Sequence, residues 1–395
     1  MRAFGRLGKI GLDSTKGAVV VKFSLIYEAQ TTDASREGDR RVFDDIVEQV
    51  ELADELGFDV AWCVEHTALT NYAHMSAPET VLPFLAGRTK RIGLGHGVTC
   101  LPPAMNHPVK VAERVATLDL LSKGRVHFGV GKGGTQQEAG TFGYDLNELH
   151  PMIDESMYLV PKMFVQDEIE HDGTYVKIPR RPIHPKPYQD PHPPMYLACT
   201  NADTLTRAGS RGLGALVLGF GGPEDVAKKN RIYREAWASR KPEDQVGFRP
   251  IEHLAALCPT IVLDDNLQAR RIGIKGQRYF MESLGHWYAN SPKPDPSTWD
   301  DDVTATDASG KAVIKTSFAS EKVSFDFSDP QMMMLNPNHA YGTVPDCIGY
   351  VSRLIEAGAD EILFICQMGT VPQWAQMETI KNIGRHVIPH FRNKA

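Results

Sequence analysis

Two ionisable residues, Glu65 and His66, directly follow a short apolar run at residues 60–64 (VAWCV). A continuous apolar run of this length is typical of a strand that is buried on both faces. In α/β barrels, polar side chains just past the C-terminal end of a strand point into the mouth of the barrel. His66 is therefore a candidate for proton transfer, because imidazole titrates near neutral pH. The alternative is that both residues only cap the strand at the protein surface.

A glycine-rich turn at residues 129–134 (GVGKGG) matches the pattern G-x-G-x-x-G. A dinucleotide site would require a helix to begin there, but residues 135–142 contain a further glycine and no clean apolar periodicity. A P-loop is excluded because Gly133 stands where that motif requires a hydroxyl. The glycines still allow backbone to approach a flat or anionic ligand closely, and Lys132 supplies a cation.

A second candidate anion site lies at residues 198–203 (ACTNAD), where a predicted strand ends in Thr200 and Asn201 just before a helix. Hydroxyl, amide and free backbone N–H groups would converge there at the positive end of the helix dipole. The alternative is ordinary N-capping. Because Lys132 would lie at the end of the adjacent strand, the two segments together predict a site for one phosphomonoester.

The sequence lacks the motifs that metal-dependent and serine hydrolases require. There is no H-E-x-x-H motif, no H-x-H in the first predicted strand and no G-x-S-x-G elbow. Single structural histidines explain His74, His96, His107 and His127 better than metal ligands do, so no metal site is predicted. An anion site, a close backbone and one histidine without a nucleophile indicate that a cofactor carries the chemistry.

Composition sets broad limits on the 395-residue chain. With 42% hydrophobic and 23% charged residues it is typical of a globular protein. A net charge of −6 gives no reason to expect nucleic acid or an anionic membrane as partner, and no apolar run is long enough to span a bilayer. The N-terminus lacks the apolar core of a secretory signal, and no cysteines form a C-x-x-C pair. We expect a cytoplasmic protein with reduced thiols.

Strand and helix patterns alternate along the chain. The predicted strands are 19–27, 60–64, 91–98, 125–130, 195–198, 215–218, 255–263 and 361–366. The predicted helices are about 42–56, 77–87, 108–121, 149–164, 202–212, 223–238, 344–357 and 374–388. Eight such pairs predict a (β/α)8 TIM barrel with insertions; the alternative is a doubly wound sheet.

We expect one domain, residues 19–395, after a flexible N-terminal tail at 1–18. Residues 28–41 are predicted to be a polar, flexible connection, and the seven prolines between 179 and 194 exclude a central strand or a helix interior there. The polar and aromatic segment 264–339 breaks the alternation and is interpreted as a long insertion. Because long connections are commonly lids, we expect it to cover the barrel mouth.

Several motifs together resemble the luciferase-like flavin monooxygenases of bacteria, over residues 21–392 apart from most of the long insertion. They are GFD with EH (57–59, 65–66), a G-x-G strand with LP and HP (95–97, 101–102, 107–108), LLSKGR with GV (120–125, 129–130), and GTVP, EAGADE and VIP near the end (342–345, 356–361, 387–389).

The resemblance implies roles for individual residues. His66 would lie beside the reactive flavin ring as an acid/base or peroxyflavin-stabilising group. Gly97 and Val98 would support the ring, where the family often has a cis non-proline peptide, and Lys132 and the Cys199–Thr200 pair would meet the FMN phosphate. The implied cofactor-binding residues are Glu65, Gly97, Val98, Thr99, Lys132, Gly133, Ala198, Cys199, Thr200, Asn201 and Ala202.

The implied activity is that of a monooxygenase that uses reduced FMN and O2 to oxygenate a small organic substrate through a flavin hydroperoxide. The resemblance also implies a separate NAD(P)H:flavin reductase and a homo-oligomer. Thr67 and Gly131 stand where luciferases have a second histidine and, in some, a cysteine, so light emission from a long-chain aldehyde is not expected. The alternatives are deazaflavin- or FMN-dependent hydride transfer on the same fold and a non-catalytic flavin-binding partner subunit; the retained His66 argues against the latter.

Overall fold

Eight parallel strands form a closed barrel in the computed structural model, which describes residues 21–299, 303–306, 312–315 and 339–393. In order around the barrel they are β1 (Lys22–Tyr27), β2 (Val60–Cys63), β3 (Gly93–Cys100), β4 (Val126–Gly131), β7 (Met195–Cys199), β8 (Gly214–Val217), β9 (Leu254–Val262) and β13 (Glu361–Ile365). Pairing of β8 with β9 and of β13 with β1 closes the ring. The predicted (β/α)8 barrel is therefore confirmed, and the doubly wound alternative is wrong.

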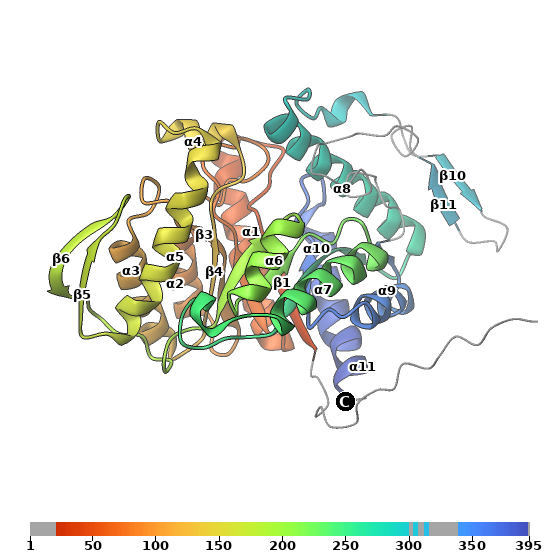
Figure 1. Cartoon of the computed structure of the whole chain (residues 1–395). Helices are drawn as coiled ribbons and strands as arrows, with labels where there is room; N and C mark the ends of the chain where they lie inside the picture. The colour runs from red at the N-terminus through yellow and green to blue at the C-terminus, as the bar shows by residue number, and fades with distance from the viewer. Residues whose placement is uncertain (1–20, 300–302, 307–311, 316–338, 394–395) are drawn as a thin grey trace, which may run out of the picture.

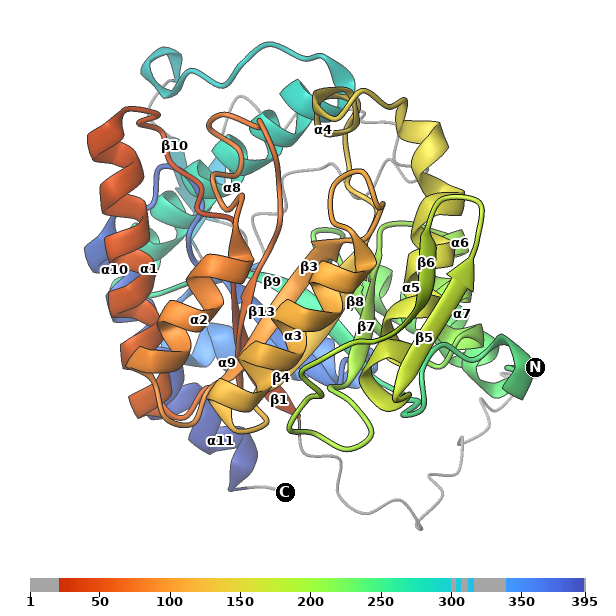
Figure 2. The ribbon, with the colours of Figure 1, turned by 90° about the vertical axis from the view of Figure 1, so that its left-hand side faces the viewer.

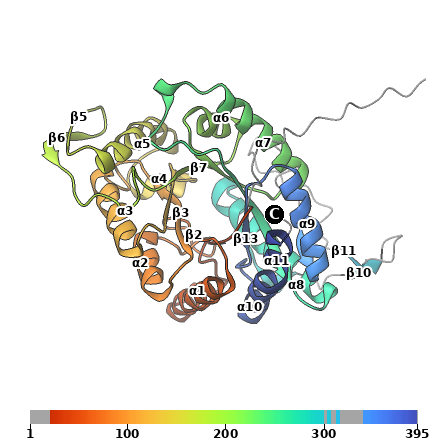
Figure 3. The ribbon, with the colours of Figure 1, turned by 90° about the horizontal axis from the view of Figure 1, so that it is seen from below.

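Helices surround this ring, as the view along the barrel shows (Figure 3). They are α1 (Arg36–Leu56), α2 (Pro78–Arg88), α3 (Pro108–Ser122), α5 (Leu149–Val165), α6 (Ala202–Ser210), α7 (Pro223–Ala238), α8 (Asn266–Ala289), α9 (Val344–Glu356) and α10 (Gln373–Asn382), which a π-helical turn (Ile383–Val387) connects to α11 (Ile388–Arg392). Apolar side chains fill the space between helices and strands, and all nine residues of β9 are buried. This burial on both faces explains why the strands read as continuous apolar runs.

A polar cluster lies inside the barrel at the N-terminal ends of the strands. Glu361, the first residue of β13, is fully buried and accepts a hydrogen bond from Trp62 Nε1 at 2.9 Å. Its second oxygen lies 2.7 Å from His253 Nε2. The Trp62 ring packs edge-on against Tyr196, with centroids 5.0 Å apart. These contacts fill the end of the barrel that faces away from the candidate site, where residues serve stability.

The helix preceding β2 begins earlier than the sequence predicts. Residues 28–41 were expected to be a flexible connection, but α1 starts at Arg36. Its N-cap is Ser35, whose hydroxyl accepts a hydrogen bond from Gly38 N at 3.1 Å. Gly57 ends the helix with a φ of 92°, a conformation that glycine adopts without steric cost. A capped but strongly polar first turn carries no apolar periodicity, which is why the pattern missed it.

An antiparallel hairpin of β5 (Glu168–Asp172) and β6 (Lys177–Pro182) stands outside the barrel (Figure 1). The sequence predicts no element here. The exclusion of a central strand holds, since the prolines of this region occur only in an edge hairpin and in loops. Backbone N–H groups of Thr174, Tyr175 and Val176 donate to the Glu155 carboxylate and hold the hairpin turn against α5.

The segment predicted as a long insertion, 264–339, begins with a regular helix of the barrel. The 24-residue α8 is capped by Asp265, whose side chain accepts from Gln268 N. An antiparallel pair, β10 (Val303–Thr306) and β11 (Ala312–Lys315), follows, and β12 (Ala340–Gly342) pairs with the end of β9. Residues 290–299 connect α8 onward with a short 3-10 turn at Pro296–Thr298. Residues 300–302, 307–311 and 316–338, like the predicted tail at 1–18, lie outside the described residues.

Directly after the glycine-rich turn is a six-residue helix, α4 (Gln136–Thr141). The sequence predicts no helix here, and that prediction is wrong. Thr135 and Glu138 form a reciprocal capping box, which stabilises a short helix despite Gly140. In Figure 2, α4 and part of α8 lie at the same end of the molecule, beyond β3 and β4.

Two general features of the chain complete the fold. All six cysteines are buried and free, as expected for reduced thiols in apolar strands. None of the helices in the described ranges has the length and apolar character that crossing a membrane requires.

Candidate active site

A cavity of about 660 Å³ opens at the C-terminal ends of the barrel strands. Residues at the ends of β1, β2, β3, β4, β7 and β8 line it, together with side chains of α5, α6 and α8. The α8 contribution is Phe280, Met281, Leu284 and Tyr288. Part of the segment predicted to cover the barrel mouth therefore does line it, as a helix rather than as a loop.

Most of the residues predicted from the sequence lie together in this cavity. They are Glu65, His66, Gly97, Val98, Lys132, Gly133, Ala198, Cys199, Thr200 and Asn201. Thr99 and Ala202 are not among the lining residues. The Thr99 hydroxyl is buried and lies 3.1 Å from His96 Nδ1, on the other side of the strand.

His66 is held between two carboxylates from different parts of the barrel. Its Nδ1 lies 2.8 Å from Glu138 Oε1 on α4, and its Nε2 lies 3.5 Å from Glu28 Oε2 just after β1. The Tyr72 ring packs against the imidazole with centroids 5.2 Å apart. The sequence predicts neither carboxylate as a partner.

The electrostatic environment raises the pKa of His66. Burial by itself lowers the pKa, but the Coulombic attraction and hydrogen bond of Glu138, followed by Glu28 and Glu65, outweigh burial and raise it to about 9. Burial raises the pKa of Glu28 to about 7, against the attraction of His66. Burial also opposes ionisation of Glu138, yet His66 and hydrogen bonds from Thr135 and Gly134 lower its pKa. At neutral pH the arrangement holds a protonated imidazole beside an ionised Glu138.

Glu138 is fixed by its position at the start of α4. Its Oε2 accepts hydrogen bonds from the N–H groups of Gly134 (3.0 Å) and Thr135 (2.9 Å) and from the Thr135 hydroxyl (2.9 Å). The other oxygen is thereby left for His66. The glycine-rich turn thus positions the carboxylate that charges the imidazole.

Glu65 has a different environment, although it is the neighbour of His66. Its Oε2 accepts a hydrogen bond from Cys100 N at 3.0 Å, and its Oε1 accepts one from Asn106 Nδ2 at 2.7 Å. Burial raises the pKa of Glu65 to about 7. Because both oxygens are engaged, Glu65 holds the end of β3 in place.

The strand end at Gly97 and Val98 differs from the arrangement that the resemblance implies. In the described residues, cis peptide bonds occur at His184-Pro185 and Asp190-Pro191, and the Gly97–Val98 bond is not among them. The register of β3 against β4 shifts between His96 and Thr99. This irregularity re-aims the strand at the floor of the cavity.

Lys132 and the turn that carries it form one wall of the cavity. Lys132 makes no ion pair with any residue of the described ranges, and burial lowers its pKa although Glu138 opposes the shift. A Cβ atom on Gly131 would lie 2.5 Å from Val98 Cγ2, so the backbone can pass here only as glycine. Gly133 has a φ of 87°, which also favours glycine. A half-buried cation that forms no ion pair with a carboxylate of the described residues, on a close-packed turn, suits an anionic ligand group.

The turn at Thr200 and Asn201 lies at the end of β7, which pairs with β4. The Asn201 side chain accepts from Thr204 N, and the Thr204 hydroxyl accepts from the N–H groups of Thr200 and Asn201. The alternative interpretation, N-capping, therefore does apply to Asn201. Of this turn, Thr200, Asn201 and Thr204 line the cavity, and Ala202 and Asp203 in the first turn of α6 do not.

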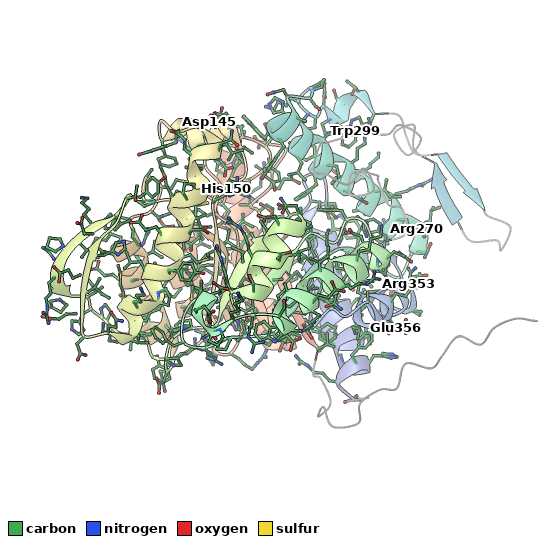
Figure 4. All side chains as sticks on the ribbon, viewed as in Figure 1. Asp145, His150, Arg270, Trp299, Arg353 and Glu356 are labelled. Carbon is green, nitrogen blue, oxygen red and sulfur yellow. The ribbon has the colours of Figure 1, made fainter. Side chains whose placement is uncertain are left out.

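Further polar residues at this end of the cavity were not predicted. Arg207 and Arg211 line the cavity and share Asp154, with Nη1–Oδ1 distances of 3.3 and 2.7 Å. His150, labelled in Figure 4, lies in the first turn of α5 and also lines the cavity. With Lys132, the arginines make this half of the cavity cationic.

The sequence contained signals for some of the missed residues. Glu28 follows β1 directly, in the same relation to its strand that singled out His66, but it was included in the predicted flexible connection. Glu138 stands three residues after Thr135, which is the spacing of a capping box. Phe280 and Arg207 carry no such signal, because only the packing of α8 and α6 brings them to the cavity.

The described residues contain no cluster of His, Cys, Asp and Glu that could hold a metal ion. The cavity does fit a phosphorylated flavin. Lys132 has no ionic partner in the described part of the chain, the glycine turn is accessible to a flat ring, and apolar and aromatic side chains of α8 and of several strands complete the walls. The cation and the closely approachable backbone that such a ligand requires both come from chain segments at the ends of adjacent strands.

Known proteins share this architecture. The sequence profile of the luciferase-like monooxygenases matches residues 22–312. The alkanal monooxygenase alpha chain of Photorhabdus laumondii is 27% identical over 237 residues, which are 60% of this chain and 62% of that protein. The oxygenase component of the flavin-dependent trigonelline monooxygenase of Acinetobacter baylyi is 25% identical over 280 residues, 68% of this chain and 72% of that protein.

Solved structures show the same fold. A monooxygenase from Streptomyces bottropensis superposes with a TM-score of 0.73 at 22% identity, covering 94% of this chain and 100% of that one. The oxygenating constituent of a Pseudomonas putida diketocamphane monooxygenase, in complex with FMN, gives a TM-score of 0.69 at 18% identity, with 93% and 98% covered. Since the profile spans most of the chain, the barrel described above belongs to the luciferase-like monooxygenase family.

Proposed function

We propose that the protein is the oxygenase of an FMN-dependent monooxygenase, which uses reduced FMN and O2 to oxygenate a small organic substrate. The observation that carries the proposal is the division of one cavity into two parts. Lys132 and the α6 N-terminus form a cationic part at β4 and β7. His66, after β2, lies with Glu28 after β1 and with Glu138 of α4. A phosphorylated flavin that spans them would meet His66 with its ring.

Each group of the chain has a distinct task in this proposal. Lys132 and the first turn of α6 bind the phosphate. Gly97, Val98 and Gly131 let the ring approach the backbone closely. His66 is held protonated at neutral pH, so it can donate a proton from Nε2 while Glu138 fixes Nδ1. The apolar side chains of α8 exclude water from the cavity.

Reduced flavin supplies the electrons that activate O2 when it is bound. The family relatives include the oxygenase component from A. baylyi, and that name supports a separate reductase as the source of reduced FMN. We propose such an NAD(P)H:flavin reductase as a partner, a cytoplasmic location and a homo-oligomeric state.

The test is an anaerobic titration of the purified protein with reduced FMN, followed by rapid mixing with O2. We expect saturable binding and then a transient absorbance that differs from those of free reduced and oxidised FMN. Lys132→Ala should weaken the binding, and His66→Asn should shorten the transient. Failure of the protein to bind reduced FMN would refute the proposal.

The same experiment decides the second candidate, hydride transfer with a deazaflavin. Among solved structures, an F420-dependent reductase from Methanopyrus kandleri has a TM-score of 0.63 at 20% identity, with 94% of this chain and 99% of that one covered. Tight binding of reduced deazaflavin with no binding of reduced FMN would favour that candidate.

A further inference from the structure

Glu28 is a buried carboxylate with an unused acceptor atom in the cavity. It directly follows β1 and is 5% exposed, and it lines the cavity. Its Oε2 is enclosed by protein and lies 3.5 Å from His66 Nε2. Its Oε1 accepts no hydrogen bond from any residue in the described part of the chain and is not among the enclosed atoms, so this oxygen is open to the cavity. A ligand that fills the cavity displaces water from Oε1, and this oxygen is left unsatisfied at a cost in free energy unless the ligand supplies a donor. The atom therefore points to a ligand group.

The position of Glu28 separates it from the proposed phosphate site. In the strand order of the barrel, β1 lies opposite β7, with three strands between them on either side. The Thr200–Asn201 turn follows β7, so Glu28 faces it from across the cavity. A ligand group at Glu28 is thus distinct from the phosphate.

Aromatic side chains line the cavity on the same side. Phe280 of α8 packs edge-on against Tyr72, with centroids 5.5 Å apart, and at a tilted angle against Phe220, with centroids 5.3 Å apart. All three residues contribute to the cavity wall. A flat apolar body packs well on such a wall. Together with one charged acceptor, the wall suits a ligand that is apolar except for a single donor.

We propose that Glu28 orients the organic substrate by accepting a hydrogen bond through Oε1, and that this substrate is a flat apolar compound with an O–H or N–H group. The proposal rests on the proposed function and names the substrate class for the same site. His66 lies on the Oε2 side of the same carboxylate, away from the oxygen that meets the substrate. A substrate that lacks the donor leaves the buried carboxylate unsatisfied and is rejected for that reason.

The groups around Glu28 define how this binding depends on pH. Four titratable side chains face Glu28. His66 and Tyr72 come from the segment after β2, Glu138 from α4 and Tyr288 from α8. The pKa of Glu28 is about 7, that of His66 about 9, and burial keeps those of both tyrosines well above their usual range. The pKa of Glu138 is lowered. Glu28 is therefore the member of this group that ionises near neutral pH, and its ionised form is the stronger acceptor.

The experiment compares two probes that differ only in the donor, 2-naphthol and its methyl ether, by equilibrium dialysis with FMN-loaded protein. We expect the wild type to bind 2-naphthol at least about tenfold more tightly than the ether, as for a hydrogen bond to a charged acceptor. The preference should grow as the pH rises through about 7. Glu28→Gln should lose the pH dependence and most of the preference, and Glu28→Asp should keep part of both.

Glu155→Gln is the matched control, because Glu155 also lies beside a histidine, with Oε1 3.0 Å from His171 Nε2, but does not line the cavity. That variant should retain the pH-dependent preference. If Glu28→Gln does not fold, the pH dependence of the wild type decides. Equal binding of both probes by the wild type, or an unchanged preference in folded Glu28→Gln, would overturn the proposal. The dialysis involves no flavin reaction, so it can fail while the reduced-FMN experiment succeeds, and the reverse.

Discussion

Replacing Glu138 by glutamine should strongly change the titration of His66. Glu138 Oε2 already accepts three hydrogen bonds, from Gly134 N, Thr135 N and the Thr135 hydroxyl. In the variant, the amide oxygen is expected to keep these three donors, so the NH2 group must face His66 Nδ1. An NH2 group can only donate, and it therefore favours the neutral imidazole.

The magnitude follows from the interaction that is lost. A hydrogen bond to a charged group is worth about 1.5–3 kcal/mol, which corresponds to about 1–2 pKa units. The pKa of His66 should therefore fall from about 9 by about 1–2 units. Reactions that need protonated His66 should lose rate at a correspondingly lower pH.

The same shift has a consequence for stability. The pKa of His66 is raised above its value in the unfolded chain, so its stabilisation is complete below the unfolded pKa and is lost as the pH rises through about 9. A shift from the ordinary value to about 9 corresponds to about 3 kcal/mol. In Glu138→Gln, this loss should be smaller and should occur at lower pH.

The assay is NMR titration of 13C-labelled histidines, with the His66 signal assigned by its absence in His66→Ala. The control is Glu155→Gln, since Glu155 Oε1 lies 3.0 Å from His171 Nε2, remote from the cavity. That variant should alter the His171 signal and leave His66 unchanged. A wild-type His66 that titrates at its ordinary pKa, or a pKa that Glu138→Gln leaves in place, would refute the reasoning.

Three further outcomes are expected. Lys132→Ala should weaken binding of reduced FMN by about 1–3 kcal/mol. The control is Lys110→Ala, which removes an exposed lysine paired with Glu113 and should leave FMN binding unchanged. Equal dissociation constants for the two variants would contradict the phosphate site. Glu28→Gln should raise the unfolding free energy by about 1–3 kcal/mol at pH above 7. The pKa of Glu28 is higher in the folded protein than in the unfolded chain, so the wild type loses stability as the pH rises from the unfolded pKa through about 7. Urea unfolding at acidic and at alkaline pH measures this, and an equal effect at both would count against it. His66→Ala should lower turnover by about 10²–10⁴-fold. The variant should also lose about 3–5 kcal/mol of folding stability, because it leaves two buried carboxylates without a counter-charge. Normal turnover would make His66 purely structural.

The fold was predictable because each strand–helix unit has a local signal. Apolar runs marked all eight barrel strands within a few residues, and caps such as Gly57 marked helix ends. The missed elements lack that signal. The hairpin β5–β6 is mostly exposed, α4 is held by a capping box rather than an apolar face, and α8 lies in a stretch whose polarity and aromatic content resemble a loop.

Only part of the candidate site could be predicted from the sequence. Strand-end rules placed His66 and Lys132 at the barrel mouth, because parallel strands bring their C-terminal ends to one face. The same rules could not show that Glu28 and Glu138 flank His66, since Glu138 is 72 residues away along the chain. Nor could they show that Thr99 faces away from the cavity.

The sequence by itself therefore determined the barrel, its open end and the presence of an imidazole and a cation there. The tertiary structure decided the charge of that imidazole. Its pKa depends on burial and on carboxylates from β1 and α4, and Coulombic interactions depend on distance in space rather than in sequence. The aromatic wall on α8 likewise exists only because the folded helix lies against the barrel mouth.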